Sequence, residues 1–320
     1  MNIKFGIKDR RVVLVIFIVF STIVMSLISP YFFTQSNLLS LLRYTTVVGL
    51  LALSQTPLII GGSGGIDLSV GSVLSLCSVI FGTLAVGFNM NPWLAALLTI
   101  LFGSLLGLIN GLFVTLLSLP PLIVTLATLY LYASLALVIS GGRDINGFDK
   151  SNFSFLGQSS ILGIPVQILF VLLPVYIFGS FLMNRTVFGR NVYAIGSSPE
   201  AAKLAGINVK FTRILLFVFS SSVASVGAIV TASWLLNARS TAGSELLLPS
   251  ITIAVLGGVI ITGGIGRVSG TFLALLLVAI LTSGMQLAGI NSTFQIGLMG
   301  FVLIVSILIR SKEQSKIMTV

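Results

Sequence analysis

Long, uninterrupted runs of apolar residues constrain this chain more than any other feature of its sequence. Leu, Ile, Val and Phe dominate repeated stretches that approach the roughly 20 residues a helix needs to cross a bilayer. Only 8% of the 320 residues are charged, whereas a soluble domain carries about a quarter. The runs do not alternate between apolar and polar residues, as the strands of a membrane barrel do. The sequence therefore predicts an all-α integral membrane protein.

About ten transmembrane helices are expected, some of them short or broken, and they form one transmembrane domain over residues 12–310. The hydrophobic segments are 12–28, 45–60, 68–88, 93–116, 122–139, 161–182, 214–236, 249–262, 270–288 and 293–310. The second and the eighth are short and flanked by glycine, so we expect re-entrant or broken helices there rather than plain spans. Residues 1–11 and 311–320 are then terminal tails.

The cationic residues predict the orientation of these helices. If the N-terminus is cytoplasmic and the chain crosses ten times, thirteen of the 17 Lys and Arg residues fall inside and four fall outside. Membrane proteins concentrate Lys and Arg in cytoplasmic loops in this way. Both termini are therefore predicted to be cytoplasmic. The net charge of +10 is explained by these loops, and we expect no nucleic-acid partner.

The longest inner loop, at 183–213, carries the pattern of a short surface helix. Ser198 is a candidate N-cap, and a proline follows at the first helical position. Glu200 then lies beside the positive end of the helix dipole. Ala201 begins a small apolar face, and Gly206 is placed to end the helix. We therefore expect a helix of about two turns on the cytoplasmic side.

Residues that could support catalysis are scarce. The chain has no histidine and one cysteine, Cys77, so neither a Ser-His pair nor a thiolate cluster can form. No glycine-rich loop with the spacing of a nucleotide-binding P-loop occurs. We therefore expect no catalysis, no metal and no cofactor. If ATP drives transport, a separate subunit must hydrolyse it.

Asp67 is the most informative polar residue, because an acid at the edge of a membrane span is costly and usually has a partner or a purpose. One interpretation is structural, with Asp67 and Ser69 capping the mouth of the third helix. The other interpretation places Asp67 on a translocation path. Asn110 and Thr125 lie within apolar segments. Each could either contact a neutral solute or form a hydrogen bond between helices.

Two glycine-rich segments resemble each other and form a candidate internal repeat. The sequence GGIDLSVGS at 64–72 resembles GGIGRVSGT at 263–271. Each follows a short apolar segment and opens a longer one. Repeated halves with interrupted helices are common in transporters, whereas convergent close packing of small residues would give the same pattern.

Several motifs together resemble the permease subunits of ribose-type ABC sugar importers, over about residues 40–310. The motifs are GGIDLSVGS at 64–72, PLIVTL at 121–126, FGRNVYAIG at 188–196, AAKLAGI at 201–207, LGG at 256–258 and GGIG at 263–266. Within this family, NARS at 237–240, LLPSIT at 247–252 and MQLAG at 285–289 are most similar to the autoinducer-2 importer permeases. Rhamnose, ribose and other pentose importers remain open.

The resemblance implies a multi-pass subunit of the bacterial inner membrane that works within a complex. Its partners would be ATPase subunits, a second permease (the same chain or a paralogue), an extracytoplasmic solute-binding protein and a small sugar-like solute. The loop that couples to the ATPase would contain Gly189, Arg190, Ser198, Glu200, Ala201 and Gly206. The translocation path or helix mouth would contain Gly64, Gly65, Asp67, Ser69, Asn110 and Thr125.

Two other classes of function are alternatives to the importer. An ion-coupled carrier or a passive channel would work without an ATPase, but the poverty of charge at membrane depth argues against ion coupling. A membrane enzyme needs acids, histidines or a Ser-Lys pair within the membrane, and Asp67 is the only intramembrane candidate.

Overall fold

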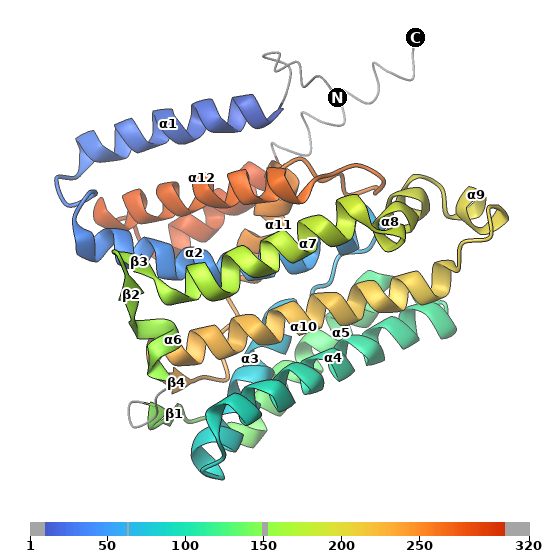
Figure 1. Cartoon of the computed structure of the whole chain (residues 1–320), viewed down its shortest axis with the longest axis horizontal. Helices are drawn as coiled ribbons and strands as arrows, with labels where there is room; N and C mark the ends of the chain where they lie inside the picture. The colour runs from blue at the N-terminus through green and yellow to red at the C-terminus, as the bar shows by residue number, and fades with distance from the viewer. Residues whose placement is uncertain (1–9, 63, 149–152, 305–320) are drawn as a thin grey trace.

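The structure is a bundle of helices that run roughly along the long axis of the molecule (Figure 1). It is a computed structural model that describes residues 10–62, 64–148 and 153–304. Within these residues, eight helices are long and apolar enough to cross a membrane. The chain is therefore a multi-pass membrane protein. Residues 1–9 of the predicted N-terminal tail, and the whole tail at 311–320, lie outside the described residues.

The eight candidate spans are α1 (Arg10–Ile28), α2 (Gln35–Ile60), α3 (Val70–Gly82) with the π-helical turn Thr83–Gly87, α4 (Pro92–Leu116), α5 (Pro121–Ser140), the π-helical turn Ile168–Leu172 with α7 (Leu173–Arg185), α10 (Val209–Leu235) and α12 (Val268–Leu287). The shorter helices are α6 (Ser154–Gln158), α8 (Val187–Ser197), α9 (Pro199–Leu204), α11 (Leu247–Leu256) and an apolar helix at Ser292–Ile304. Figure 1 shows α8 and α9 at one end of the bundle, which we call the α8–α9 end.

Local sequence explains where several of these helices begin. The Asn91 side chain accepts a hydrogen bond from the Trp93 amide at 2.9 Å, and Pro92 occupies the first turn of α4. Asn208 accepts from the Phe211 amide at 3.0 Å at the start of α10. Such caps satisfy backbone donors that have no partner within the helix.

The centre of the bundle is α10, which packs against α2, α3 and α4. A row of glycines at four-residue spacing, Gly103, Gly107 and Gly111, forms the α4 side of this contact. A Cβ at Gly111 would lie 2.9 Å from the Ile214 Cα, and one at Gly107 would meet the Phe217 carbonyl. Small residues at this spacing let membrane helices approach backbone to backbone.

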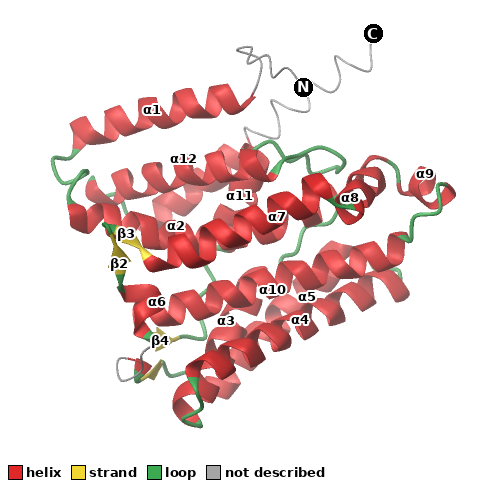
Figure 2. Cartoon of the chain, in the orientation of Figure 1, coloured by secondary structure: helices red, strands yellow, loops and turns green. Residues whose placement is uncertain are grey.

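Four short strands lie at the end opposite α8 and α9, which we call the strand end (Figure 2). β1 (Ile145–Asn146) pairs antiparallel with β4 (Asn237–Ala238), with Ile145 opposite Ala238. β2 (Ser160–Ile161) pairs with β3 (Ile164–Pro165) in a hairpin. The first pair joins two loops that are far apart in sequence, and so fixes the end of α10 near the loop that follows α5.

Two sequence predictions about segment bounds were wrong. The second segment is not short, because α2 begins at Gln35 rather than at residue 45 and has 26 residues. The sixth segment does not begin at residue 161, since residues 160–165 form the β2–β3 hairpin. Leu162 and Gly163 have φ angles of 52° and 79° there, which a helix cannot contain.

The prediction of a short eighth segment is confirmed, because α11 has 10 residues and would span about 15 Å, half of a bilayer core. The two halves of the candidate repeat also share a layout. Each has a non-helical stretch between two helices, at residues 61–62 and 64–69 between α2 and α3 and at residues 257–267 between α11 and α12.

Candidate functional site

Asp67 lies at the centre of a buried polar network in the non-helical stretch before α3. Its side chain is fully buried. One carboxyl oxygen accepts hydrogen bonds from the Ser69 amide at 2.9 Å and from the Ser69 hydroxyl at 2.5 Å, while the other accepts from Ser220 of α10 at 3.4 Å. The Gln55 side chain binds the Asp67 backbone twice. Its carbonyl oxygen accepts from the Asp67 N–H at 3.2 Å, and its amide nitrogen donates to the Asp67 C=O at 2.6 Å. This arrangement fixes the turn against α2 and α10.

The network continues through Ser69 into α4 and α5. The Asn110 amide donates to the Ser69 hydroxyl at 2.9 Å, and the Tyr132 hydroxyl donates to the Asn110 carbonyl oxygen at 3.2 Å. Thr125 donates to the Ile66 carbonyl at 3.4 Å and to its own helix at 2.9 Å. The sequence-predicted group of Asp67, Ser69, Asn110 and Thr125 is thus brought together around one turn.

The two predicted glycines of this group have different surroundings. Gly64 has a φ of +71°, a conformation that residues with a Cβ rarely adopt, and a Cβ there would meet nothing within 4 Å. Gly65 packs closely, because its Cβ would lie 2.5 Å from the Leu58 carbonyl oxygen at the end of α2. Gly65 therefore allows the chain to turn back along α2 toward Asp67.

The predicted short helix between the sixth and seventh segments is confirmed as α9 (Pro199–Leu204). Ser198 is its N-cap and accepts from the Ala201 amide at 3.2 Å, with Pro199 and Glu200 in the first turn. Gly206 follows the helix with a φ of +81°. Glu200 and Ala201 are both exposed, so this helix presents an open surface.

A second helix, α8, precedes α9 and was not predicted. The Thr186 hydroxyl caps it by accepting from the Gly189 amide at 3.2 Å. A Cβ at Gly189 would meet the Met183 carbonyl oxygen, so Gly189 permits the sharp corner between α7 and α8. Arg190 is exposed on the same helix. All six predicted loop residues therefore lie on α8, on α9 or at their ends.

The end of α8 packs against both glycine-rich stretches at once. A Cβ at Gly196 would meet the Ile60 carbonyl oxygen at the end of α2 and the Gly264 amide nitrogen before α12. The Gly264 amide donates to the same Ile60 carbonyl at 2.8 Å, and the Tyr193 hydroxyl donates to the Gly266 carbonyl at 2.9 Å. We call this contact of three backbone segments the glycine junction. It connects α8 directly to the end of α2 and to the residues just before α12.

A hydroxyl-rich cavity of about 370 Å³ lies between α3, α5 and the 240–247 segment. Its lining includes the hydroxyl-bearing residues Ser72, Ser75, Ser134, Ser240, Thr241 and Ser244. Leu68 lines it as well, next to Asp67 in sequence. The cavity wall thus combines a few neutral hydroxyl groups with a surface that is mostly apolar, and Asp67 is not among its lining residues.

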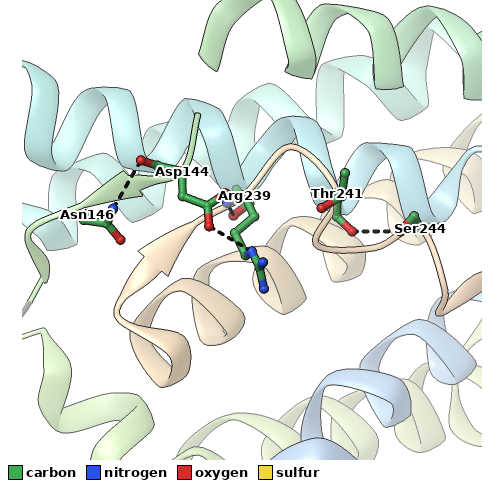
Figure 3. Close-up of polar contacts among 6 residues, drawn as sticks. Asp144, Asn146, Arg239, Thr241 and Ser244 are labelled. Carbon is green, nitrogen blue, oxygen red and sulfur yellow. Dashed lines mark hydrogen bonds and ion pairs between the residues drawn. The ribbon is translucent and has the colours of Figure 1, made fainter. Parts of the chain in front are cut away.

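An ion pair fixes the loops beside this cavity at the strand end (Figure 3). The Arg239 Nε atom lies 3.1 Å from the Asp144 carboxylate, with both side chains nearly half exposed. The Thr241 carbonyl accepts from the Ser244 hydroxyl at 2.9 Å, as Figure 3 also shows. An exposed pair contributes at most about 1 kcal/mol, so we regard it as a positioning contact for the loop.

Four participating residues were missed by sequence reasoning. Gln55, Tyr132 and Ser220 belong to the Asp67 network, and Gly196 belongs to the glycine junction. Gln55 carried a usable signal, since it is a lone amide in an apolar run. Tyr132 and Ser220 lie in helices where aromatic and hydroxyl residues are ordinary, and so nothing distinguished them.

Comparison with known proteins places the chain in a family. The family model described as "Branched-chain amino acid transport system / permease component" matches residues 37–307. The ribose import permease protein RbsC of Bacillus subtilis (strain 168) is 35% identical over 92% of this chain and 90% of its own length. The autoinducer 2 import system permease protein LsrD of Escherichia coli (strain K12) is 35% identical over 97% of this chain and 94% of its own length. No solved structure shows significant similarity. The chain therefore belongs to the branched-chain amino acid transport system / permease component family.

Proposed function

We propose that this chain is the membrane-spanning permease subunit of an ATP-binding-cassette importer in the bacterial inner membrane, for a small neutral sugar-like solute of the ribose, rhamnose or autoinducer-2 type. The observation that carries the proposal is 35% identity, over nearly the whole chain, to a ribose import permease and an autoinducer 2 import permease. ATPase subunits, a second permease and a solute-binding protein complete the complex. The chain itself has a transport role and no catalytic one.

Uptake by the reconstituted complex tests this proposal. Vesicles containing the permease with its ATPase and binding protein are expected to accumulate labelled solute when ATP is supplied, and to stop when a non-hydrolysable analogue replaces it. Accumulation by the permease alone without ATP would contradict the proposal and favour a carrier or channel.

The hydroxyl-rich cavity is our candidate for the wall of the translocation path. Among the described residues, the wall offers apolar side chains and neutral hydroxyl groups and no charged group, so it matches a neutral sugar-like solute better than a charged one. A second permease facing this cavity would close the path. In this assignment Asp67, Ser69, Asn110 and Thr125 shape the helix mouth behind the wall, while Leu68 and Ser72 face the solute.

Filling this cavity is expected to slow uptake without dissociating the complex. Ser134 lines the cavity from α5 and is exposed, so Ser134→Leu places an apolar side chain in the path and removes a hydroxyl. Solute uptake should fall several-fold while the amount of ATPase recovered with the permease is unchanged. Leu135→Phe is the matched control, because Leu135 is exposed on the same helix and does not line the cavity. Normal uptake by Ser134→Leu would exclude this cavity from the path.

The exposed surface of α8 and α9 is our candidate contact for the ATPase. These helices lie together at one end of the bundle, where α1 begins and α7 ends (Figure 1). By the distribution of Lys and Arg, this is the cytoplasmic end. Movement of α8 would act directly on the glycine junction, and so on the stretches that precede α3 and α12.

Reversing the charge on α9 is expected to weaken ATPase association. Glu200 is exposed in the first turn of α9, and Glu200→Lys places a cation beside the positive end of the helix dipole and reverses the contact charge. We expect about fivefold less ATPase in a pull-down, which corresponds to about 1 kcal/mol for an exposed charge. Glu245→Lys makes the same change on an exposed residue next to the cavity and should not alter recovery of the ATPase. Equal recovery with both variants would exclude α9 as the contact.

A further inference from the structure

A second and much larger cavity lies on the opposite side of the bundle, between α1, α7 and α12. Its volume is about 1620 Å³. The helix α1 packs on α12, and α12 packs on α7, so the cavity is a groove between three helices rather than an enclosed pocket. Figure 1 shows α1 at the edge of the bundle, alongside α12. The proposed path does not account for this groove, and the glycine junction contributes only Tyr193 and Gly266 to its lining.

Three arginines from three different elements line one end of the groove. Arg11 is in the first turn of α1, Arg185 is the last residue of α7, and Arg267 directly precedes α12. Asn184 and Tyr193 add polar groups beside them, and no acidic residue is among the lining residues that the structure describes. This end of the groove is therefore cationic. Guanidinium groups bind phosphate oxygens in a bidentate manner, which an ammonium group cannot do.

The rest of the groove is apolar and runs away from the arginines into the membrane-spanning part of the bundle. Ile177 and Phe181 of α7 are exposed and lie eight and four residues before Arg185, which is about 12 and 6 Å along the helix. Ile16 of α1 and Leu273 of α12 extend the same surface from their own helices. A long apolar surface thus continues directly from a cationic end.

We propose that this groove binds an anionic phospholipid, with its phosphate at Arg185 and Arg267 and an acyl chain along Ile16, Ile177 and Leu273. A phospholipid matches this groove, because its phosphate would lie at the cationic end and its hydrocarbon chain along the apolar part. Basic pockets between transmembrane helices are recognised binding sites for anionic lipid headgroups. A soluble anion would use only the cationic end, and an apolar protein helix would offer no anionic group to Arg185 and Arg267.

The bound lipid would also connect α1 to the bundle. Only 11% of the residues in the spanning window of α1 are buried, so protein contacts cover little of this helix. An acyl chain between α1 and α7 would supply apolar contacts that the protein does not make. The lipid is therefore expected to stabilise the position of α1 without taking part in solute recognition.

Native mass spectrometry of the purified permease tests this proposal without any transport assay. The protein would be exchanged into detergent with an equal mixture of phosphatidylglycerol and phosphatidylcholine. We expect the wild type to retain phosphatidylglycerol in preference, and Arg185→Gln and Arg267→Gln each to weaken retention about fivefold. Lys210→Gln is the matched control, because Lys210 is an exposed cation at the start of α10 that does not line the groove.

Two further arms separate a lipid site from other sources of anion binding. Ile177→Trp fills the apolar part of the groove and leaves every arginine in place, so it should lower lipid retention if the acyl chain lies there. Excess inorganic phosphate should fail to displace the lipid. Equal loss with Lys210→Gln, displacement by phosphate alone, or unchanged retention in both arginine variants would each overturn the proposal.

Discussion

Gly196→Ala is expected to remove most of the folded permease, although it adds only one methyl group. The new Cβ would meet the Ile60 carbonyl oxygen and the Gly264 amide nitrogen, and both are backbone atoms that cannot rotate away. Overpacking of a close contact costs about 1–3 kcal/mol, and this contact involves three backbone segments. The yield of monodisperse protein in detergent and its melting temperature should both fall.

Gly297→Ala is the control, since Gly297 is exposed and a Cβ there would meet nothing within 4 Å. Within a helix, replacing Gly by Ala is ordinarily stabilising by up to about 1 kcal/mol. The two variants are thus predicted to shift stability in opposite directions. A Gly196→Ala protein as stable as the wild type would show that the glycine junction is not closely packed, and that α8 does not act on both interrupted regions.

Asp67→Ala is expected to produce the second large effect. It removes the acceptor of the Ser69 amide, the Ser69 hydroxyl and the Ser220 hydroxyl, all within a fully buried site. Leaving a buried polar group unpaired costs about 1–3 kcal/mol, and more than one group is affected here. Melting temperature and folded yield should therefore drop sharply.

Asp67→Asn separates the two interpretations of this residue. The asparagine oxygen can still accept from Ser69, and its amide can donate to the Ser220 hydroxyl. If Asp67 only shapes the helix mouth, Asp67→Asn should keep nearly normal stability and nearly normal uptake. Normal stability with lost uptake would instead show that the negative charge acts in transport, and would contradict our placement of Asp67 behind the path wall.

The sequence predicted the helical class because burying backbone in lipid leaves few alternatives, whereas the bounds of α2 depended on tertiary contacts. Polar residues in the first turns of α2 interrupt the apolar pattern, so the predicted segment began at residue 45 instead of at Gln35. Asn37 accepts from Ser283 of α12 at 3.0 Å, and Arg43 donates to the Gln158 carbonyl at 2.5 Å. These partners are more than 100 residues distant, so no local pattern reveals that the polar residues belong to the same helix as the buried residues after Thr45.

In the candidate site too, features set by local sequence could be predicted, and features set by distant contacts could not. α9 could be predicted to within a few residues, because an N-cap, a first-turn proline and a terminal glycine act within one helix. Asp67 and Ser69 were predicted to share one turn, whereas Asn110 was recognised only as a polar residue in apolar surroundings. Their assembly into one network, and the meeting of Gly196 with Ile60 and Gly264, depend on how distant helices pack.

Purification of the chain from its native membrane in mild detergent, with every associated subunit identified by mass, tests the central claim most directly. We predict recovery of an ATPase and of two permease chains, either two copies of this one or this chain with a paralogue. Recovery of this chain alone, still moving solute in vesicles without ATP, would contradict the importer and establish a carrier or channel.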